Sequence, residues 1–238
     1  MAKKSCRRPR TFVLGDLHGA FTPLAELITR VNFNPFEDKL IFLGDLADGW
    51  DDFDLCVDFF LSIQNFVPII GNHDFFIIEY LKTNKINKNW EKFGGKGTIE
   101  KIKKSSELAA KLESYFSKAK YYHVEEDKIF MHGGFNPDRP IDMQNNKRFA
   151  SNRKLFQTSK TLEEQKRKVN VTFKNEDHKI KEIFIGHSTT NTHKPVFRAN
   201  LINLDTGIKN DGKLTLMDVK SKEYIQSRPA KFYYSKEK

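Results

Sequence analysis

Residues 11–19 read TFVLGDLHG, a short run rich in apolar residues that ends in glycine and continues with an acidic residue and a histidine. The same pattern returns at residues 40–49, LIFLGDLADG, and at residues 67–74, VPIIGNHD. Between these runs, apolar residues recur at helical spacing over residues 24–31 and 53–63. Strands that alternate with helices predict parallel βαβ units and therefore an α/β fold.

The second half of the chain is richer in predicted strands. Strands are expected at residues 128–132, 183–186, 196–198, 201–204 and 214–219. One long surface helix is expected over residues 99–116, where apolar residues recur at helical spacing. Residues 147–181 are the least core-like stretch, and we interpret them as a polar, partly helical insertion or cap. We expect the chain to consist of a basic tail at residues 1–9 and a single domain at residues 10–238, which includes this insertion.

Composition limits the functional classes. Lysine and arginine number 41 against 31 aspartate and glutamate residues, which gives a net charge of +10. This excess indicates either a solvated surface or attraction to an anionic substrate, and no motif favours dedicated nucleic-acid binding. Two cysteines exclude a disulfide scaffold. No apolar run is long enough to cross a membrane, so we expect no membrane partner and a cytoplasmic location.

Metal-binding residue types follow the predicted strands. In α/β sheets, ligands bind beyond the carboxyl ends of the strands, so these side chains are expected to converge. The candidate metal ligands are Asp16, His18, Asp45, Asn72, His132 and His187. Carboxylates combined with neutral imidazoles suit manganese, iron, cobalt or zinc better than magnesium or calcium. Six ligands are too many for one tetrahedral ion, and we therefore expect two divalent ions that share Asp45.

These blocks together resemble a known family. GDLHG, GDLADG, GNHD, HGG and GH occur in this order within residues 14–188. The order resembles the calcineurin-like metallophosphoesterase superfamily, in particular its phosphoprotein phosphatase branch and a group of bacterial serine/threonine-phosphatase-like proteins with a DGW variant of the second block. The resemblance implies a four-layer α/β/β/α fold, in which a central β-sandwich of mixed sheets is flanked by helices.

The resemblance also implies roles for the site residues. The first ion is implied to bind Asp16, His18 and Asp45. The second is implied to bind Asp45, Asn72, His132 and His187. His73 is implied to be the general acid, oriented by Asp48, and Asn72 is implied to contact the substrate phosphate as well.

One departure concerns the phosphate contact. The second block of the family ends in Asp-Arg-Gly, with the arginine on the substrate phosphate, whereas this chain reads Asp48-Gly49-Trp50. A further arginine of the family follows the HGG block, and Arg153 matches its place best. Arg139 and Arg148 are competing candidates.

The function expected from these residues is dimetal-dependent phosphoester hydrolysis, with water held between the ions as the in-line nucleophile. Manganese is the first choice of metal, with iron or zinc as alternatives. The first choice of substrate is a phosphomonoester, either a protein phosphorylated on serine or threonine or a small phosphoester. A dinucleoside polyphosphate such as diadenosine tetraphosphate, or another nucleotide, is the alternative. Trp50, Trp90 and Phe93 would then stack a base, unless they serve as core or lid packing. A non-catalytic module that binds phosphorylated ligands is a minor alternative.

Overall fold

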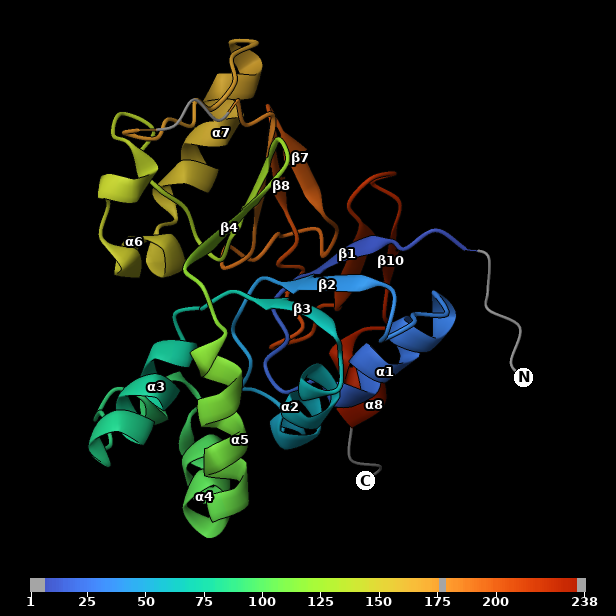
Figure 1. Cartoon of the computed structure of the whole chain (residues 1–238), viewed down its shortest axis with the longest axis vertical. Helices are drawn as coiled ribbons and strands as arrows, with labels where there is room; N and C mark the ends of the chain where they lie inside the picture. Colours follow the sequence, from blue (N-terminus) through green and yellow to red (C-terminus); the bar gives the residue numbers. More distant parts are fainter. Residues whose placement is uncertain (1–6, 176–178, 235–238) are drawn as a thin grey trace.

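A computed structural model describes residues 7–175 and 179–234 of the chain. Two five-stranded β-sheets stack face to face, and helices cover the outer face of each (Figure 1). The predicted four-layer α/β/β/α arrangement is thereby confirmed. Most of the predicted basic tail lies outside the described residues.

The first sheet has the strand order β10-β9-β1-β2-β3. Its strands are β1 (Thr11–Leu14), β2 (Lys39–Phe42), β3 (Asn65–Pro68), β9 (Thr215–Asp218) and β10 (Tyr224–Gln226). β1, β2 and β3 are parallel, with Val13 opposite Ile41 and Ile41 opposite Val67. β9 is antiparallel to both β1 and β10. The parallel strands all end at one edge, as the βαβ pattern predicts.

The second sheet has the strand order β4-β5-β6-β8-β7. Its strands are β4 (Tyr122–Glu125), β5 (Lys128–Met131), β6 (Glu182–Ile185), β7 (Val196–Arg198) and β8 (Leu201–Asn203). The central strands β5, β6 and β8 are parallel, whereas β4 and β7 are antiparallel edge strands. Both sheets are therefore mixed.

Helices form the two outer layers. The first sheet is covered by α1 (Phe21–Arg30), α2 (Phe53–Leu61), α3 (Asp74–Thr83), α4 (Lys96–Lys104), α5 (Ser106–Ser117) and α8 (Ala230–Tyr234). The second sheet is covered by α6 (Asn146–Ser151) and α7 (Lys154–Glu164). Two short 3-10 turns, η1 (Glu91–Phe93) and η2 (Ile141–Met143), lie in the connections.

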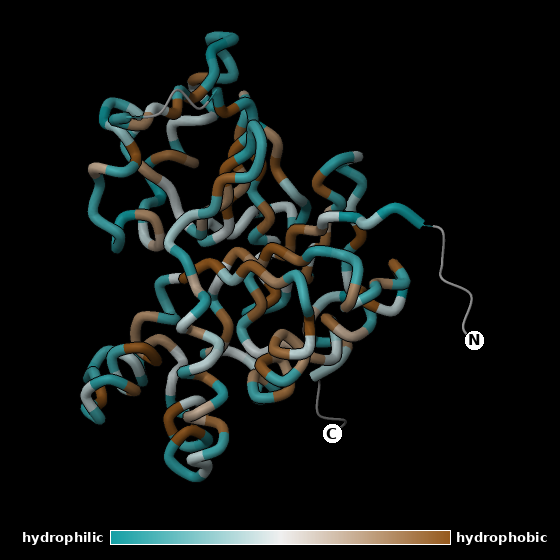
Figure 2. The backbone as a smooth tube through the Cα atoms, in the orientation of Figure 1, coloured by the Kyte–Doolittle hydropathy of each residue, from teal (hydrophilic) through white to brown (hydrophobic). Residues whose placement is uncertain are grey.

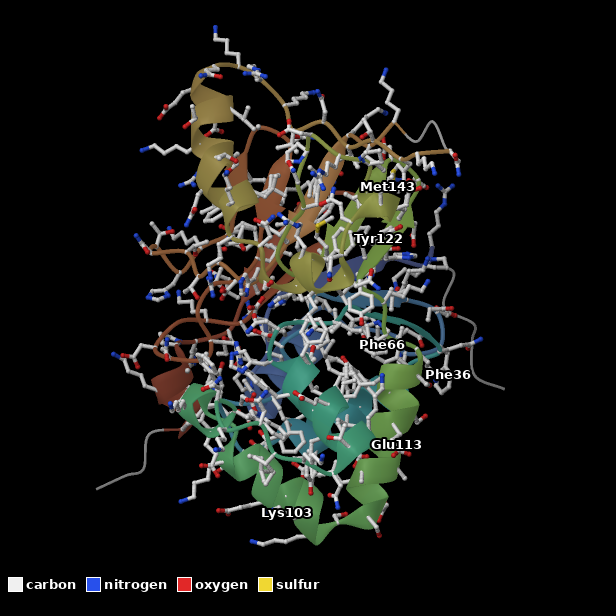
Figure 3. The ribbon with its side chains drawn as sticks, turned by 90° about the vertical axis from the view of Figure 1, so that its left-hand side faces the viewer. Phe36, Phe66, Lys103, Glu113, Tyr122 and Met143 are labelled. Atoms are coloured by element: carbon white, nitrogen blue, oxygen red, sulfur yellow. The ribbon has the colours of Figure 1, made fainter. Side chains whose placement is uncertain are left out.

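Apolar side chains fill the space between the layers. The tube in Figure 2 is most hydrophobic along the strands, where the two sheets face each other. Val13, Ile41 and Phe184 belong to this inner core, and all three are fully buried. Figure 3 labels Phe66, which belongs to β3 of the first sheet, and Lys103 of α4, which lies at the far end of the helical layer. Burial of this kind is the main favourable contribution to the stability of such a fold.

Two expected elements differ in their bounds. The single helix predicted over residues 99–116 is two helices, α4 and α5, because the backbone is extended at Ser105. The hydroxyl of Ser105 accepts a hydrogen bond from the backbone N–H of Leu108 at 3.1 Å, as an N-cap does. The third predicted strand begins earlier, at Asn65, and Ile69 beyond its end forms an isolated bridge to Lys120.

The segment at residues 147–181 contributes to the outer layer of the second sheet. Phe149, Leu155 and Val169 are buried against that sheet. The backbone N–H of Val169 donates to the side chain of Asn200 at 2.8 Å, which fixes the return of the segment to the domain. The role of this segment as a specificity cap stays a prediction.

Arg7 and Arg10 bind the start of the chain to the first sheet. Both guanidinium groups contact the fully buried carboxylate of Asp38, at 2.5 Å and 3.0 Å. Cys56 is a buried free thiol on α2, whereas Cys6 lies outside the described residues. Across residues 7–175 and 179–234, no helix has the length and apolar character needed to span a bilayer.

Candidate metal centre and active site

The candidate site lies where strands of both sheets end. His18 follows β1, Asp45 follows β2, His132 follows β5 and His187 follows β6. Three of these residues have a left-handed backbone, with φ of 49° at His18, 59° at Asp45 and 64° at His187. Such angles are unfavourable for residues other than glycine and cluster at functional sites.

Asp45 is the centre of the arrangement. Its Oδ2 lies 3.6 Å from Nε2 of His18 and 3.3 Å from Nε2 of His132. Candidate ligand atoms lie within 4.8 Å of one another in two groups, His18–Asp45–His73 and Asp45–His132–His187. Only Asp45 belongs to both groups, which is the geometry expected of a shared carboxylate.

A glycine allows Asp45 to take this place. A Cβ atom at Gly71 would lie 2.2 Å from Oδ1 of Asp45, so no other residue fits there without moving the carboxylate. The neighbouring Asp74 carboxylate accepts hydrogen bonds from the backbone N–H groups of Asp45 and Gly71, at 3.1 Å and 2.8 Å. Asp74 is the first residue of α3, and its carboxylate joins the chain segments that follow β2 and β3.

Three histidines are oriented for metal binding. Nδ1 of His18 donates to the carbonyl of Ala47 at 3.0 Å, and Nδ1 of His132 donates to the carbonyl of Leu43 at 2.7 Å. Nε2 of His187 donates to the carbonyl of Ser151 at 3.2 Å. Since a carbonyl only accepts, each ring keeps one unprotonated nitrogen when it is neutral. A backbone or carboxylate partner on the second nitrogen is typical of metal-binding histidines.

Electrostatics favour a cation at this place. Burial lowers the pKa of His18 and of His187 to about 3, so both imidazoles are neutral, the form that binds a metal. Burial opposes protonation of His132, but Asp45 and Asp16 hold its pKa at about 10. A bound cation would replace that proton as the counter-charge of the buried carboxylates. The donor set therefore fits two divalent ions.

Asp16 and Asn72 lie beside these groups. The backbone N–H of His187 donates to both oxygens of Asp16, at 3.2 Å and 3.1 Å. Oδ1 of Asn72 lies 3.2 Å from Nε2 of His132. The structure brings both residues to the site, and their roles as ligands stay predictions.

His73, which lies in the first of these groups, is also paired with Asp48. Nδ1 of His73 lies 2.9 Å from Oδ2 of Asp48, and both side chains are buried. The carboxylate of Asp48 also accepts from the indole nitrogen of Trp90 at 2.9 Å and from the hydroxyl of Thr98 at 2.8 Å. Asp48 thus accepts from Trp90 and Thr98 as well as from His73. With Nδ1 on this carboxylate, Nε2 of His73 points away from Asp48.

Sequence reasoning missed Thr98, Asp205 and Lys209 around the site, and it gave Trp90 another role. Trp90 and Thr98 belong to the stretch WEKFGGKGT, whose Gly-Gly-x-x-Thr pattern was the available signal. Asp205 is buried, and burial together with Asp205 raises the pKa of Asp16 well above its usual value. Nζ of Lys209 lies 3.0 Å from Nε2 of His73, and no local pattern distinguishes this lysine.

The sequence profile of the calcineurin-like phosphoesterases matches residues 9–215. The chain belongs to the calcineurin-like phosphoesterase family. The superfamily predicted from the five blocks is thereby confirmed.

Relatives of this phosphoesterase include curated nucleotide hydrolases. A protein of Haemophilus influenzae (strain PittEE) named "Bis(5'-nucleosyl)-tetraphosphatase, symmetrical" is 30% identical over 130 residues, which are 54% of this chain and 45% of that protein. The matches span less than half the length of such relatives.

Solved structures of low sequence identity share the fold. A crystal structure provisionally described as a diadenosine tetraphosphatase superposes with a TM-score of 0.65 at 18% identity, over 94% of this chain and 95% of that one. A protein serine/threonine phosphatase of Saccharomyces cerevisiae gives a TM-score of 0.55 at 17% identity, over 94% and 81% of the two chains.

The candidate arginines of the phosphoesterase take different places. Nη1 of Arg153 donates to the carbonyl of His187 at 2.5 Å, so this arginine lies next to a candidate ligand. Arg148 lines a cavity of about 550 Å³ beside α7. Arg139 is exposed in the connection after β5. Of the three, Arg153 is the one bound to a candidate ligand residue, and its contact with a phosphate stays a prediction.

The three aromatic residues predicted to stack a base differ in their burial and contacts. Trp90 is fully buried and donates to Asp48, so it cannot stack a ligand base. Trp50 stacks on Tyr234, with ring centroids 4.2 Å apart. Phe93 is 52% exposed, and its ring lies 6.4 Å from that of His73. Phe93 alone of the three predicted stacking residues offers an open ring beside the site.

Proposed function

We propose that this phosphoesterase is a hydrolase that requires two divalent metal ions and cleaves dinucleoside polyphosphates. The observation that supports it best is the arrangement of His18, His132 and His187 around Asp45. Each of these imidazoles has one nitrogen on a backbone carbonyl, the second nitrogen of His18 and of His132 lies near Asp45, and the His73–Asp48 pair lies beside them. Metal binding and proton transfer thus have separate residues within one site.

Each residue has a role in the proposed reaction. Asp16, His18 and Asp45 would hold one ion, and Asp45, Asn72, His132 and His187 the other. When bound, the ions would polarise the phosphoryl group and lower the pKa of water, with manganese as the first choice and iron or zinc as alternatives. His73 would donate a proton from Nε2 to the leaving oxygen, because Asp48 fixes Nδ1 on its other side. Arg153 and Asn72 would contact the phosphate.

The substrate class is supported by two observations. The curated relatives are named for hydrolysis of bis(5'-nucleosyl) tetraphosphates. Phe93 offers an exposed ring beside His73, where the base of a nucleotide would stack. The second candidate is phosphomonoester hydrolysis of the serine/threonine phosphatase type, supported by the resemblance of the motif blocks to the phosphoprotein phosphatase branch.

A direct comparison of substrates tests this proposal. Protein loaded with manganese would be assayed on diadenosine tetraphosphate, p-nitrophenyl phosphate and a phosphoserine peptide. We expect the highest kcat/KM for diadenosine tetraphosphate. A higher value for the phosphopeptide would favour the second candidate. No hydrolysis of any substrate by fully loaded protein would favour the phosphate-binding module.

Replacement of the proposed acid is the second test. His73→Asn should lower kcat by a factor of about 100 to 10,000, the usual contribution of general acid catalysis. The metal content should stay near that of the unmodified protein. Unchanged turnover would remove His73 from the mechanism.

A further inference from the structure

The position of the missing arginine cannot carry a side chain in this structure. It is occupied by Gly49, and a Cβ atom there would lie 2.8 Å from both the Cβ atom and the carbonyl oxygen of His18. One of those contacts is with backbone, which cannot move without displacing the loop that carries His18. A substitute for the missing cation must therefore come from another part of the chain.

Lys209 brings a cation to the same pair of residues. It lies in the connection between β8 and β9 and is half-buried. Its ammonium group is 3.0 Å from Nε2 of His73 and 3.0 Å from the carbonyl oxygen of Phe93. The carbonyl oxygen of Phe93 is one acceptor, and Nε2 of His73 is the second in the tautomer whose Nδ1–H donates to Asp48. An ammonium group has three donors, so one is left for an incoming anion.

Trp50 fixes the connection that carries this lysine. Its indole nitrogen donates to the carbonyl of Ile208 at 2.8 Å, directly before Lys209. Its ring stacks on Tyr234 with an interplanar angle of 12°. The tryptophan that follows Gly49 is thus in contact with the backbone next to the lysine.

We propose that Lys209 contacts the substrate phosphoryl group in place of the missing arginine, with Trp50 as its positioning residue. The proposal rests on the proposed function, since it names a further substrate contact in the same site. An anionic phosphoryl oxygen is a stronger acceptor for an ammonium group than a neutral imidazole or carbonyl. An incoming phosphoryl oxygen can therefore take the third donor of the ammonium group or replace one of its two present acceptors.

The test uses inorganic phosphate as the probe. Its affinity for the manganese-loaded protein would be measured by calorimetry, for the unmodified chain and for Lys209→Met, Lys209→Arg and Lys220→Met. Lys220 is the matched control, because it is exposed and follows Asp218, at the edge of the first sheet opposite the site. Elemental analysis of each variant would show that the metal content is the same.

The expected result is a loss of phosphate affinity of about 10- to 100-fold in Lys209→Met, the usual effect of one hydrogen bond to a charged group. Lys209→Arg should recover part of this affinity, and Lys220→Met should lose none. Trp50→Phe keeps the stacked ring and removes the donor, and it should weaken phosphate binding less than Lys209→Met does.

A different pattern would overturn the proposal. If Lys209→Met lowers kcat for p-nitrophenyl phosphate while the affinity for phosphate is unchanged, the lysine only orients His73. If Lys209→Met and Lys220→Met have equal affinity and equal activity, the lysine has no role in the site. Because phosphate affinity is measured without turnover, failure of the unmodified chain to hydrolyse any substrate would count against the proposed function and not against this contact.

Discussion

The indole nitrogen of Trp90 donates to both carboxylate oxygens of Asp48, each at 2.9 Å. The same carboxylate binds His73, so a fully buried residue of the helical layer holds the candidate acid in place. Polar partners of this kind fix the tautomer and the direction of an imidazole. The site is therefore supported from the helical layer as well as from the ends of the strands.

Removal of the third donor to Asp48 should slow catalysis without unfolding the protein. Thr98→Val has nearly the same volume and lacks the hydroxyl that donates to Asp48 at 2.8 Å. We expect kcat to fall about 10-fold, as for other partners of site residues, with the metal content unchanged. Thr98→Ser keeps the donor and should stay within about twofold of the unmodified enzyme. Equal rates for the valine and serine variants would show that this hydrogen bond is dispensable.

Loss of the shared carboxylate should abolish binding of the metal pair. Asp45→Asn keeps the size of the side chain, but it weakens two ligand groups at once. We expect fewer than one tightly bound ion per chain by elemental analysis, together with loss of hydrolysis. Asp54→Asn on the surface of α2 is the control and should keep its ions. Hydrolysis by the unmodified chain in excess chelator would contradict the whole metal assignment.

The exposed ring beside His73 should affect one class of substrate only. Phe93→Ala removes the stacking surface for a base, which contributes about 1–3 kcal/mol in other proteins. We expect kcat/KM for diadenosine tetraphosphate to fall about 10-fold or more, and that for p-nitrophenyl phosphate to change less than about twofold. Phe197→Ala, at an exposed aromatic residue of β7, is the control. An equal loss for both substrates would assign Phe93 to the support of His73 instead.

The ion-pair cluster at the start of β1 predicts a pH dependence of stability. Burial raises the pKa of Asp38, but hydrogen bonds from the side chain of Arg10 and from the backbone of Asn34 and Arg10 outweigh it, so the pKa is lowered overall. The folded state thus binds fewer protons than the unfolded state, in which the pKa is about 3.9. The contribution of Asp38 is complete above that value and is lost as the pH falls through the lower folded pKa.

Denaturant titration in the presence of chelator measures this effect. Asp38→Asn should lower the free energy of unfolding by about 1–3 kcal/mol at pH 7. The difference between the variant and the unmodified chain should shrink as the pH is lowered below about 3.9. Asp211→Asn, at an exposed turn residue, should show neither change. A difference that is independent of pH would mean that Asp38 contributes through packing alone.

The fold could be predicted because its parallel strands are short apolar runs that each end in a glycine and a polar residue. The same runs place His18, Asp45 and His73 at the carboxyl edge of the sheet, so their convergence follows from the topology. The break between α4 and α5 had a signal in the Ser105-Ser106-Glu107 sequence, which is typical of a helix start. The apolar periodicity across residues 99–116 concealed it.

The contacts that hold the site residues in place could not be predicted from the sequence in the same way. Trp90 and Asp48 are 42 residues apart, and Lys209 and His73 are 136 residues apart. No local pattern specifies such contacts. Trp90 was expected to stack a base or to pack in the core, and the structure gives it a buried position with a polar partner.

The candidate ligands are divided between the two sheets, with His18 and Asp45 after strands of the first and His132 and His187 after strands of the second. A folding chain that has formed only one sheet presents only part of the coordination shell. If two ions bind as proposed, their tight binding requires both sheets to have formed and docked, and the bound ions would link the two sheets. Separation of the sheets would then release the cations, and we expect metal loading to raise the melting temperature.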